Sequence, residues 1–126
     1  MNKSQQSGFT LIELVMVIVI LGVLAAVALP KFVSVDAEAK AAALAGVAGS
    51  LSSASAINYA GRKVTPTKGV PLPNCTAAEN ALQGPLPTGY VITAAGIAVD
   101  ATVSCTLTQT INGVAATATF TATGID

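Results

Sequence analysis

An unbroken apolar run near the amino terminus constrains this chain more than any other feature. Residues 9–29 read FTLIELVMVIVILGVLAAVAL, and Glu13 is the single charged residue among them. As a helix, this run spans roughly 31 Å at about 1.5 Å per residue, which matches the ~30 Å hydrocarbon core of a bilayer. The sequence therefore predicts a membrane-spanning helix over residues 9–30, preceded by a short polar leader at residues 1–8.

The composition supports a membrane segment and removes most enzymatic chemistry. Only 10% of the 126 residues are charged, whereas a soluble domain has about 25%. Acidic and basic residues balance at six each, so we expect no nucleic-acid partner. The chain has no His, and Cys75 and Cys105 are its only thiols. His-based catalysis and four-cysteine metal sites are excluded, so we expect no enzyme, no catalytic residue, no metal and no cofactor.

An ordinary secretory signal peptide is the main alternative for the apolar run. Residues 14–24 would be its apolar region, and Ala26-Val27-Ala28 has the small-x-small form of a cleavage site. However, the acidic Glu13 lies where such a peptide needs positive charge, and Pro30 follows the cut by only two residues. This alternative would give a secreted binding protein that is released after Ala28.

Glu13 is an acid inside an apolar helix and needs a partner. Such a charge costs on the order of 2.5–3.5 kcal/mol at the bilayer centre and less towards the surface. Phe9 lies four residues upstream on the same helical face. Cleavage between Gly8 and Phe9 would create a free amine there, with an ordinary pKa near ~7.7–8.0. We expect Glu13 to pair with that amine, in its own chain or in a neighbouring one. A tolerated charge at the membrane boundary is the alternative.

Residues 8–32, GFTLIELVMVIVILGVLAAVALPKF, resemble the amino terminus of type IV prepilins. The residues that stand where the family places them are Gly8, Phe9, Thr10, Leu11, Glu13 and Pro30. The resemblance implies that a prepilin peptidase cuts after Gly8 and methylates the new amine of Phe9, and that Glu13 is the assembly carboxylate. The short leader is similar to that of type IVa pilins, and residues 30–61 resemble pilins of the mannose-sensitive haemagglutinin type.

The same resemblance implies an α+β pilin fold, in which a long amino-terminal helix packs on a small antiparallel β-sheet. The subunit would wait in the inner membrane as a single-pass protein. The pilus assembly machinery would then polymerise it into a helical homo-oligomer, an extracellular fibre for adhesion or motility. A pseudopilin of a type II secretion system is the alternative within the superfamily. Major pseudopilins use an acidic calcium loop near the carboxyl end, where this sequence offers only Asp100 and Asp126.

The helix is expected to continue over residues 31–61 as an amphipathic segment that ends at Gly61. Its predicted packing stripe consists of Val33, Ala37, Ala41, Leu44, Val47, Ala48, Leu51, Ala54 and Ile57. Small residues in this stretch favour close packing on the chain's own sheet or close approach of helices in a fibre. Gly22 and Pro30 cost about 1 and 3 kcal/mol in a helix interior, so we expect a bend near Pro30.

Residues 62–126 are expected to form a globular β domain. Asn112-Gly113 predicts a hairpin of residues 102–111 and 114–123, with one apolar face and one face of hydroxyls. Residues 90–93 and 97–100 are predicted to add one or two more strands. Thr76 and Glu79 have the spacing of a capping box, which predicts a short helix over residues 77–83.

Cys75 and Cys105 are expected to form a disulfide outside the cytoplasm, and a free thiol pair is the alternative. The bond would contribute about 3.5 kcal/mol in the chain-entropy model. Many type IV pilins carry a carboxyl-terminal disulfide, but here the second cysteine lies inside a predicted strand. Three cations, Arg62, Lys63 and Lys68, are expected to be solvated or to cap the helix. The glycosylation sequon at Asn74 is interpreted as a chance match.

Overall fold

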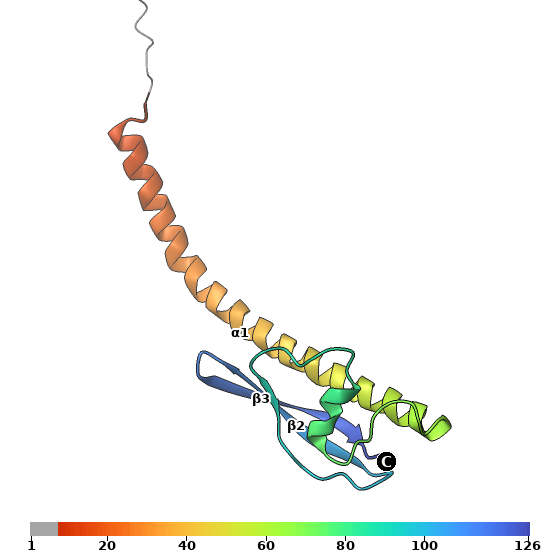
Figure 1. Ribbon diagram of the computed structural model, residues 1–126. Helices are drawn as coiled ribbons and strands as arrows, with labels where there is room; N and C mark the ends of the chain where they lie inside the picture. Colours follow the sequence, from red (N-terminus) through yellow and green to blue (C-terminus); the bar gives the residue numbers. More distant parts are fainter. Residues whose placement is uncertain (1–7) are drawn as a thin grey trace, which may run out of the picture. The chain divides into compact units, whose positions relative to one another are not determined.

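The computed structural model describes residues 8–126 (Figure 1). The chain divides into two compact units, Met1–Ala39 and Lys40–Asp126. Helix α1, Leu11–Val64, contributes to both units. The second unit also contains the short 3-10 helix η1, Cys75–Ala81, and strands β1, Tyr90–Ile92, β2, Thr102–Ile111, and β3, Val114–Thr123. The expected combination of a long helix and a small antiparallel sheet is therefore confirmed.

Helix α1 runs through Pro30 without interruption. Because proline has no N–H, the carbonyl of Ala26 lacks its usual donor four residues ahead. The bend expected at this position stays a prediction. The predicted helix end at Gly61 is wrong, because the Thr65 N–H donates to the Gly61 carbonyl at 2.9 Å and extends the ladder by one turn. Arg62 and Lys63 then lie in the last turn, where cations are favoured by the helix dipole.

The buried face of α1 in the second unit differs from the predicted stripe. Leu44, Ala48 and Leu51 are buried as expected. Four members of the predicted stripe are exposed, with 72% of the surface of Val33 and 73% of that of Ile57 accessible, and the other two are Ala37 and Ala41. Two polar residues complete the buried face instead, the first four positions after Leu51 and the second three positions further along the helix. These are Ser55 and Asn58, at 1% and 8% exposure.

Hydrogen bonds to backbone groups explain why the two polar residues are buried. The Thr123 N–H donates to the Ser55 hydroxyl at 3.0 Å. The Asn58 amide donates to the Val70 carbonyl and accepts from the Val70 N–H, both at 2.8 Å. Buried polar side chains are tolerated when they are hydrogen-bonded, so Ser55 and Asn58 fasten α1 to β3 and to the loop that follows the helix.

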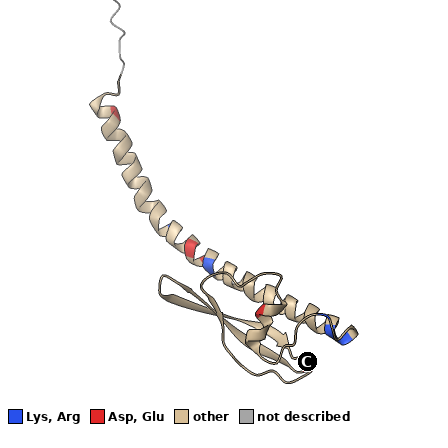
Figure 2. Cartoon of the chain, viewed as in Figure 1, with Lys and Arg blue, Asp and Glu red and all other residues tan. Residues whose placement is uncertain are grey.

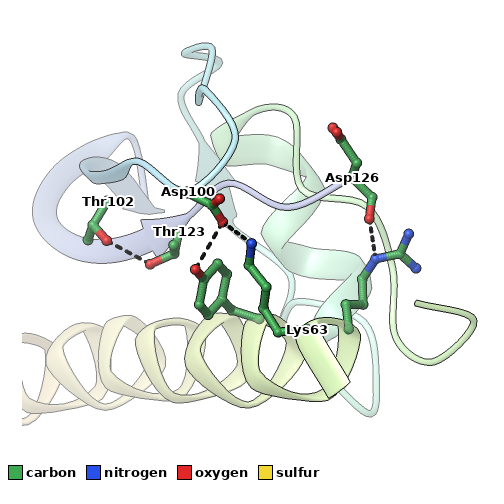
Figure 3. A network of polar contacts seen from close by, with 7 residues as sticks. Lys63, Asp100, Thr102, Thr123 and Asp126 are labelled. Atoms are coloured by element: carbon green, nitrogen blue, oxygen red, sulfur yellow. Dashed lines mark hydrogen bonds and ion pairs between the residues drawn. The ribbon is translucent and has the colours of Figure 1, made fainter. Parts of the chain in front are cut away.

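The sheet has the strand order β1-β2-β3, and both pairings are antiparallel. The predicted hairpin is confirmed in register, with Ile111 opposite Val114 and Cys105 opposite Phe120. Asn112 and Gly113 have φ angles of 51° and 78°, the left-handed pair that a type I′ turn requires. On the apolar face of the hairpin, Cys105, Leu107, Phe120 and Ala122 are buried in the core, whereas Val114 beside the turn is exposed. On the other face, the hydroxyls of Thr102 and Thr123 lie 2.8 Å apart (Figure 3).

Two local predictions fail. Residues 97–100 form no strand, and Val99 makes only an isolated bridge to Gly124. The reason is a tight turn, in which Asp100 has a φ of 62° and the Ala101 N–H donates to the Ala98 carbonyl. The predicted capping box at Thr76 is also wrong. Helix η1 starts two residues earlier than expected because the Asn74 side chain accepts from the Ala77 N–H at 2.9 Å and acts as the cap.

The core of the second unit is centred on the expected disulfide. Cys75 and Cys105 are bonded and are 0% and 1% exposed. The other fully enclosed apolar side chains around them include Leu51, Leu72, Ala78, Leu107 and Ala122. Gln109, a polar residue that the hydrophobic pattern does not assign to the core, is buried on the apolar face of β2 and donates to the Tyr90 hydroxyl at 2.7 Å.

Candidate assembly site

The first unit presents apolar side chains on every side of α1. No residue in its most apolar 18-residue window is buried, and the mean hydropathy of that window is 3.0. The exposed large side chains from this unit are Phe9, Leu11, Ile12, Leu14, Val15, Met16, Val17, Ile18, Val19, Ile20, Leu21, Val23, Leu24, Val27, Leu29, Phe32, Val33 and Val35. By length and composition, α1 can cross a membrane. A helix that is apolar all round is stable in lipid or among other apolar helices.

The predicted cleavage position lies just outside this helix. Gly8 and Phe9 precede the first helical residue, Leu11, and have no regular secondary structure. Phe9 has 89% of its surface accessible, and a side chain added at Gly8 would meet open space. Exposed irregular backbone is where peptidases cut most readily. The remainder of the predicted leader, residues 1–7, lies outside the described residues.

Thr10 and Glu13 form a capping box at the start of α1. The Thr10 N–H donates to the Glu13 Oε2 at 2.8 Å, and the Glu13 N–H donates to the Thr10 Oγ1 at 3.3 Å. Two backbone donors that a helix start leaves without partners are satisfied in this way. Glu13 therefore has a backbone hydrogen-bond partner in Thr10 while residues 8 and 9 are still joined. The Thr-x-x-Glu spacing of Thr10 and Glu13 is the sequence signal for this capping box.

The second carboxylate oxygen of Glu13 is open to another donor. Within residues 8–126, the described hydrogen bonds of this side chain use Oε2 alone. Because a carboxylate accepts several hydrogen bonds, an ammonium can approach Glu13 while the cap stays in place. The predicted pairing with the amine of Phe9 stays a prediction.

The structure does not bring Gly22 and Pro30 to this site. Pro30 lies 17 residues beyond Glu13 in the same helix, which is about 26 Å at 1.5 Å per residue. A side chain added at Gly22 would meet no atom within 4 Å. Both positions thus belong to the apolar segment as a whole and not to the cluster of Phe9, Thr10 and Glu13.

The other end of α1 is fixed by a polar network in the second unit (Figure 3). The Lys63 ammonium lies 2.5 Å from the Asp100 carboxylate, which also accepts from the Tyr59 hydroxyl at 2.9 Å. The Arg62 Nε donates to the Asp126 carbonyl at 2.7 Å. Arg62 and Lys63 therefore tie the last helical turn to the segments beside it, in agreement with the helix-capping interpretation of the basic cluster.

Electrostatics within this network favour its charged form. The Lys63 ammonium, followed by the Tyr59 hydroxyl, lowers the pKa of Asp100 below its ordinary value. The hydrogen bond to Asp100 in turn raises the pKa values of Lys63 and Tyr59. Among the residues that the structure describes, no group of three His, Cys, Asp or Glu side chains could hold a metal ion.

Comparison with known proteins identifies the amino-terminal segment. The family model described as the prokaryotic N-terminal methylation motif matches residues 3–29. This chain carries a prokaryotic N-terminal methylation motif. Two curated relatives also match part of the chain, and no solved structure matches.

The two relatives differ in name and in extent of similarity. The chain is 55% identical over 40 residues to the type II secretion system core protein G of Pseudomonas aeruginosa, covering 32% of this chain and 28% of that protein. It is 47% identical over 60 residues to the type IV narrow pilus major component PilA5 of Thermus thermophilus, covering 48% of this chain and 52% of that protein. The chain thus matches between about a quarter and a half of the length of these relatives.

Proposed function

We propose that this chain is a structural subunit of a type IV pilus, processed by a prepilin peptidase and polymerised through its amino-terminal helix. The observation that carries the proposal is a helix with an apolar surface on every side, directly preceded by an exposed Gly8–Phe9 bond. The methylation motif over residues 3–29 supports the same processing. The role is architectural and involves no catalysis or cofactor.

The apolar segment would have two environments in succession. In the inner membrane, lipid surrounds the side chains of residues 9–30 as a single-pass anchor. After cleavage, apolar helices of other subunits replace the lipid, so no step exposes this surface to water. The globular unit stays outside the fibre core, where its buried disulfide reinforces a small hydrophobic core. The partners are other copies of the chain, the prepilin peptidase and the pilus assembly machinery.

Glu13 would have two roles, one in the membrane and one during polymerisation. Its Oε2 caps the helix start through Thr10, which satisfies backbone groups that lipid cannot. The open side of the same carboxylate would then pair with the methylated amine of Phe9 in a neighbouring subunit. An ion pair in an apolar surrounding is strongly favoured over two separate charges. The pair would therefore fix the axial register between subunits.

A pseudopilin of a type II secretion system is the second candidate. The 55% identity to the core protein G favours it, although that match covers only 32% of this chain. The globular unit favours the pilus, because the described residues near Asp100 provide no cluster of acidic ligands. Asp100 itself is engaged with Lys63 and Tyr59. Fibres on the cell surface in a strain without type II secretion genes would support the pilus, and their strict dependence on those genes would support the pseudopilin.

The signal-peptide alternative is weakened by where its cut would fall. Ala26-Val27-Ala28 lies inside α1, with helical residues on both sides. Two variants distinguish cleavage after Gly8 from cleavage after Ala28. Gly8→Leu should leave the chain unprocessed, while Ala28→Leu should not change processing, since the prepilin cut does not involve Ala28. The mass of the product on a gel or by mass spectrometry checks both. The opposite pattern, with Ala28→Leu blocking release, would refute the proposed processing.

A further inference from the structure

A hollow of about 530 Å³ opens in the second unit beside the carboxyl-terminal part of α1. The helix forms one wall, and the loop after it, together with the end of η1, forms the other. The walls include Ser50, Ser53, Ile57, Lys68, Asn80 and Leu82. Concave sites of this size hold small ligands or the side chains of a partner. We name this hollow the α1 pocket.

The α1 pocket changes in character along the helix. Ser50 and Ser53 have small side chains, which leave room at its amino-terminal end. Ile57 comes next and is largely exposed, although it is a large apolar residue. Lys68 lies level with the last turns of the helix, because its carbonyl accepts from the Arg62 Nη1 at 3.4 Å. The pocket therefore offers free space, then an apolar surface, and then a cation.

A second surface of the chain carries matching groups in the same order. Phe32 and Val35 lie beyond residue 30, where the predicted membrane span ends, and 72% and 59% of their surfaces are accessible. Glu38 follows three residues after Val35, and positions three apart share one face of a helix. Figure 2 shows acidic residues near the middle of α1, just beyond its apolar segment. We name Phe32, Val35 and Glu38 the exposed stripe.

We propose that the α1 pocket of one copy receives the exposed stripe of a second copy, whose α1 runs parallel to the first. Val35 of the second copy then lies beside Ile57 of the first. Glu38, about one turn further on, comes level with Lys68. Phe32, about one turn back, fills the space beside the two serines. The contact buries apolar side chains that the single chain leaves exposed to water.

Charge complementarity favours the exposed stripe as the occupant. Of the residues that line the α1 pocket, only Lys68 is charged. Within residues 8–126, the structure gives no ion pair to the Lys68 ammonium or to the Glu38 carboxylate. Because both residues are exposed, their pairing adds little affinity, but it selects the orientation of the second copy. Most of the affinity comes from the apolar side chains.

The order of the groups selects parallel helices. In a parallel pair, Glu38 lies on the carboxyl-terminal side of Val35 and therefore reaches Lys68. An antiparallel pair would carry Glu38 towards Ser53, away from the cation. Copies that share one membrane or one fibre have parallel α1 helices, so the contact fits the proposed polymerisation, on which this inference rests.

The contact requires one copy to be displaced along the helix axis relative to the other. Ile57 is 22 residues beyond Val35, which corresponds to about 33 Å at 1.5 Å per residue. Copies at equal depth in a membrane place identical residues side by side and cannot make this contact. Because the two surfaces differ, the contact is heterologous and does not close on itself. The copy that fills one pocket offers its own pocket to a third copy, so the contact belongs to a growing fibre.

Cysteine cross-linking in fibres sheared from cells tests the contact. In Val35→Cys/Ile57→Cys, each thiol faces the other type of thiol in the next copy. Packed helices lie about 8–10 Å apart, which brings facing Cα atoms within the range of a disulfide. Mild oxidation should give a ladder of linked dimers, trimers and longer chains on a non-reducing gel. The membrane fraction of the same cells should give no ladder, and a ladder there would contradict the axial displacement.

Val33→Cys/Ile57→Cys is the matched control. Val33 is the same residue type as Val35 and is also exposed, but it lies about 200° away around the helix. We expect at least a five-fold lower yield of linked chains from this pair. Equal ladders from the two pairs, or fibres of Val35→Cys/Ile57→Cys without a ladder, would overturn the proposal.

A charge reversal tests the same contact without cysteines. In the otherwise natural chain, Lys68→Glu places two carboxylates together and should lower the yield of sheared fibres several-fold. Adding Glu38→Lys restores opposite charges and should restore the yield, which a loss of the fold would not allow. An undiminished yield with Lys68→Glu, or no recovery in the double variant, would contradict the pairing. Either result leaves the proposed pilus role in place if the natural chain forms fibres, whereas no fibres from the natural chain would overturn that role itself.

Discussion

The contact between Asn58 and Gly69 shows how α1 holds the loop that follows it. It also predicts that the effects of substitutions at these two positions on the free energy of unfolding do not add. Asn58 makes two hydrogen bonds to the backbone of Val70. At about 1 kcal/mol for each bond, Asn58→Ala should lower the free energy of unfolding of the second unit by about 2 kcal/mol. The next residue back along the loop, Gly69, lies directly against the same side chain.

Gly69 is required for two separate reasons. It has a φ of +75°, and a Cβ at this position would lie only 2.3 Å from the Asn58 Oδ1. The left-handed backbone alone costs a non-glycine residue about 1–2 kcal/mol. The clash would also displace the Asn58 amide and cost about 2 kcal/mol more in hydrogen bonds. Gly69→Ala should therefore destabilise the natural chain by about 3–4 kcal/mol.

In the Asn58→Ala background the clash is absent, so Gly69→Ala should cost only the 1–2 kcal/mol of backbone strain. The predicted coupling between the two changes is thus about 2 kcal/mol, with the double variant less destabilised than the sum. Pulse proteolysis in urea, on the full chain in a non-ionic detergent, measures all four free energies. Equal costs of Gly69→Ala in both backgrounds would refute the proposed contact.

Two further predictions concern the charged groups. Glu13→Ala should leave the chain in the membrane but abolish fibres, and Glu13→Gln, which keeps a capping side chain but no charge, should also abolish them. Electron microscopy of surface fibres checks both, and normal fibres with Glu13→Gln would restrict Glu13 to helix capping. Because the folded pKa of Asp100 is depressed below 3.8, its contribution to stability is present above that pH and is lost as the pH falls through the folded pKa. Asp100→Asn should remove this part of the pH dependence of the free energy of unfolding. An unchanged dependence of stability on pH in the variant would contradict the proposed role of Asp100.

The sequence predicted the features that depend on local chemistry. Asn112-Gly113 requires left-handed backbone at two successive positions, and this choice alone sets the register of β2 and β3. Their alternation then determines which face is apolar. The methylation motif and the apolar run are likewise local, so the amino-terminal segment could be recognised without a structure.

Features that depend on distant backbone groups could not be predicted in this way. A count of apolar residues placed Ile57 in the buried face of α1, but Ser55 and Asn58 are buried there because Thr123 and Val70 offer hydrogen bonds. The sequence does not show those partners. At η1, Asn74 and Thr76 are both good caps, and only the bond from the Ala77 N–H shows which one starts the helix.

The central claim is that the same apolar helix leaves lipid and enters a fibre. Its most direct test is the mass of the subunit in fibres sheared from intact cells. We expect a chain that starts at methylated Phe9 and retains residues 9–35. A subunit that starts at Leu29, or a released chain that stays monomeric in buffer without detergent, would contradict the account.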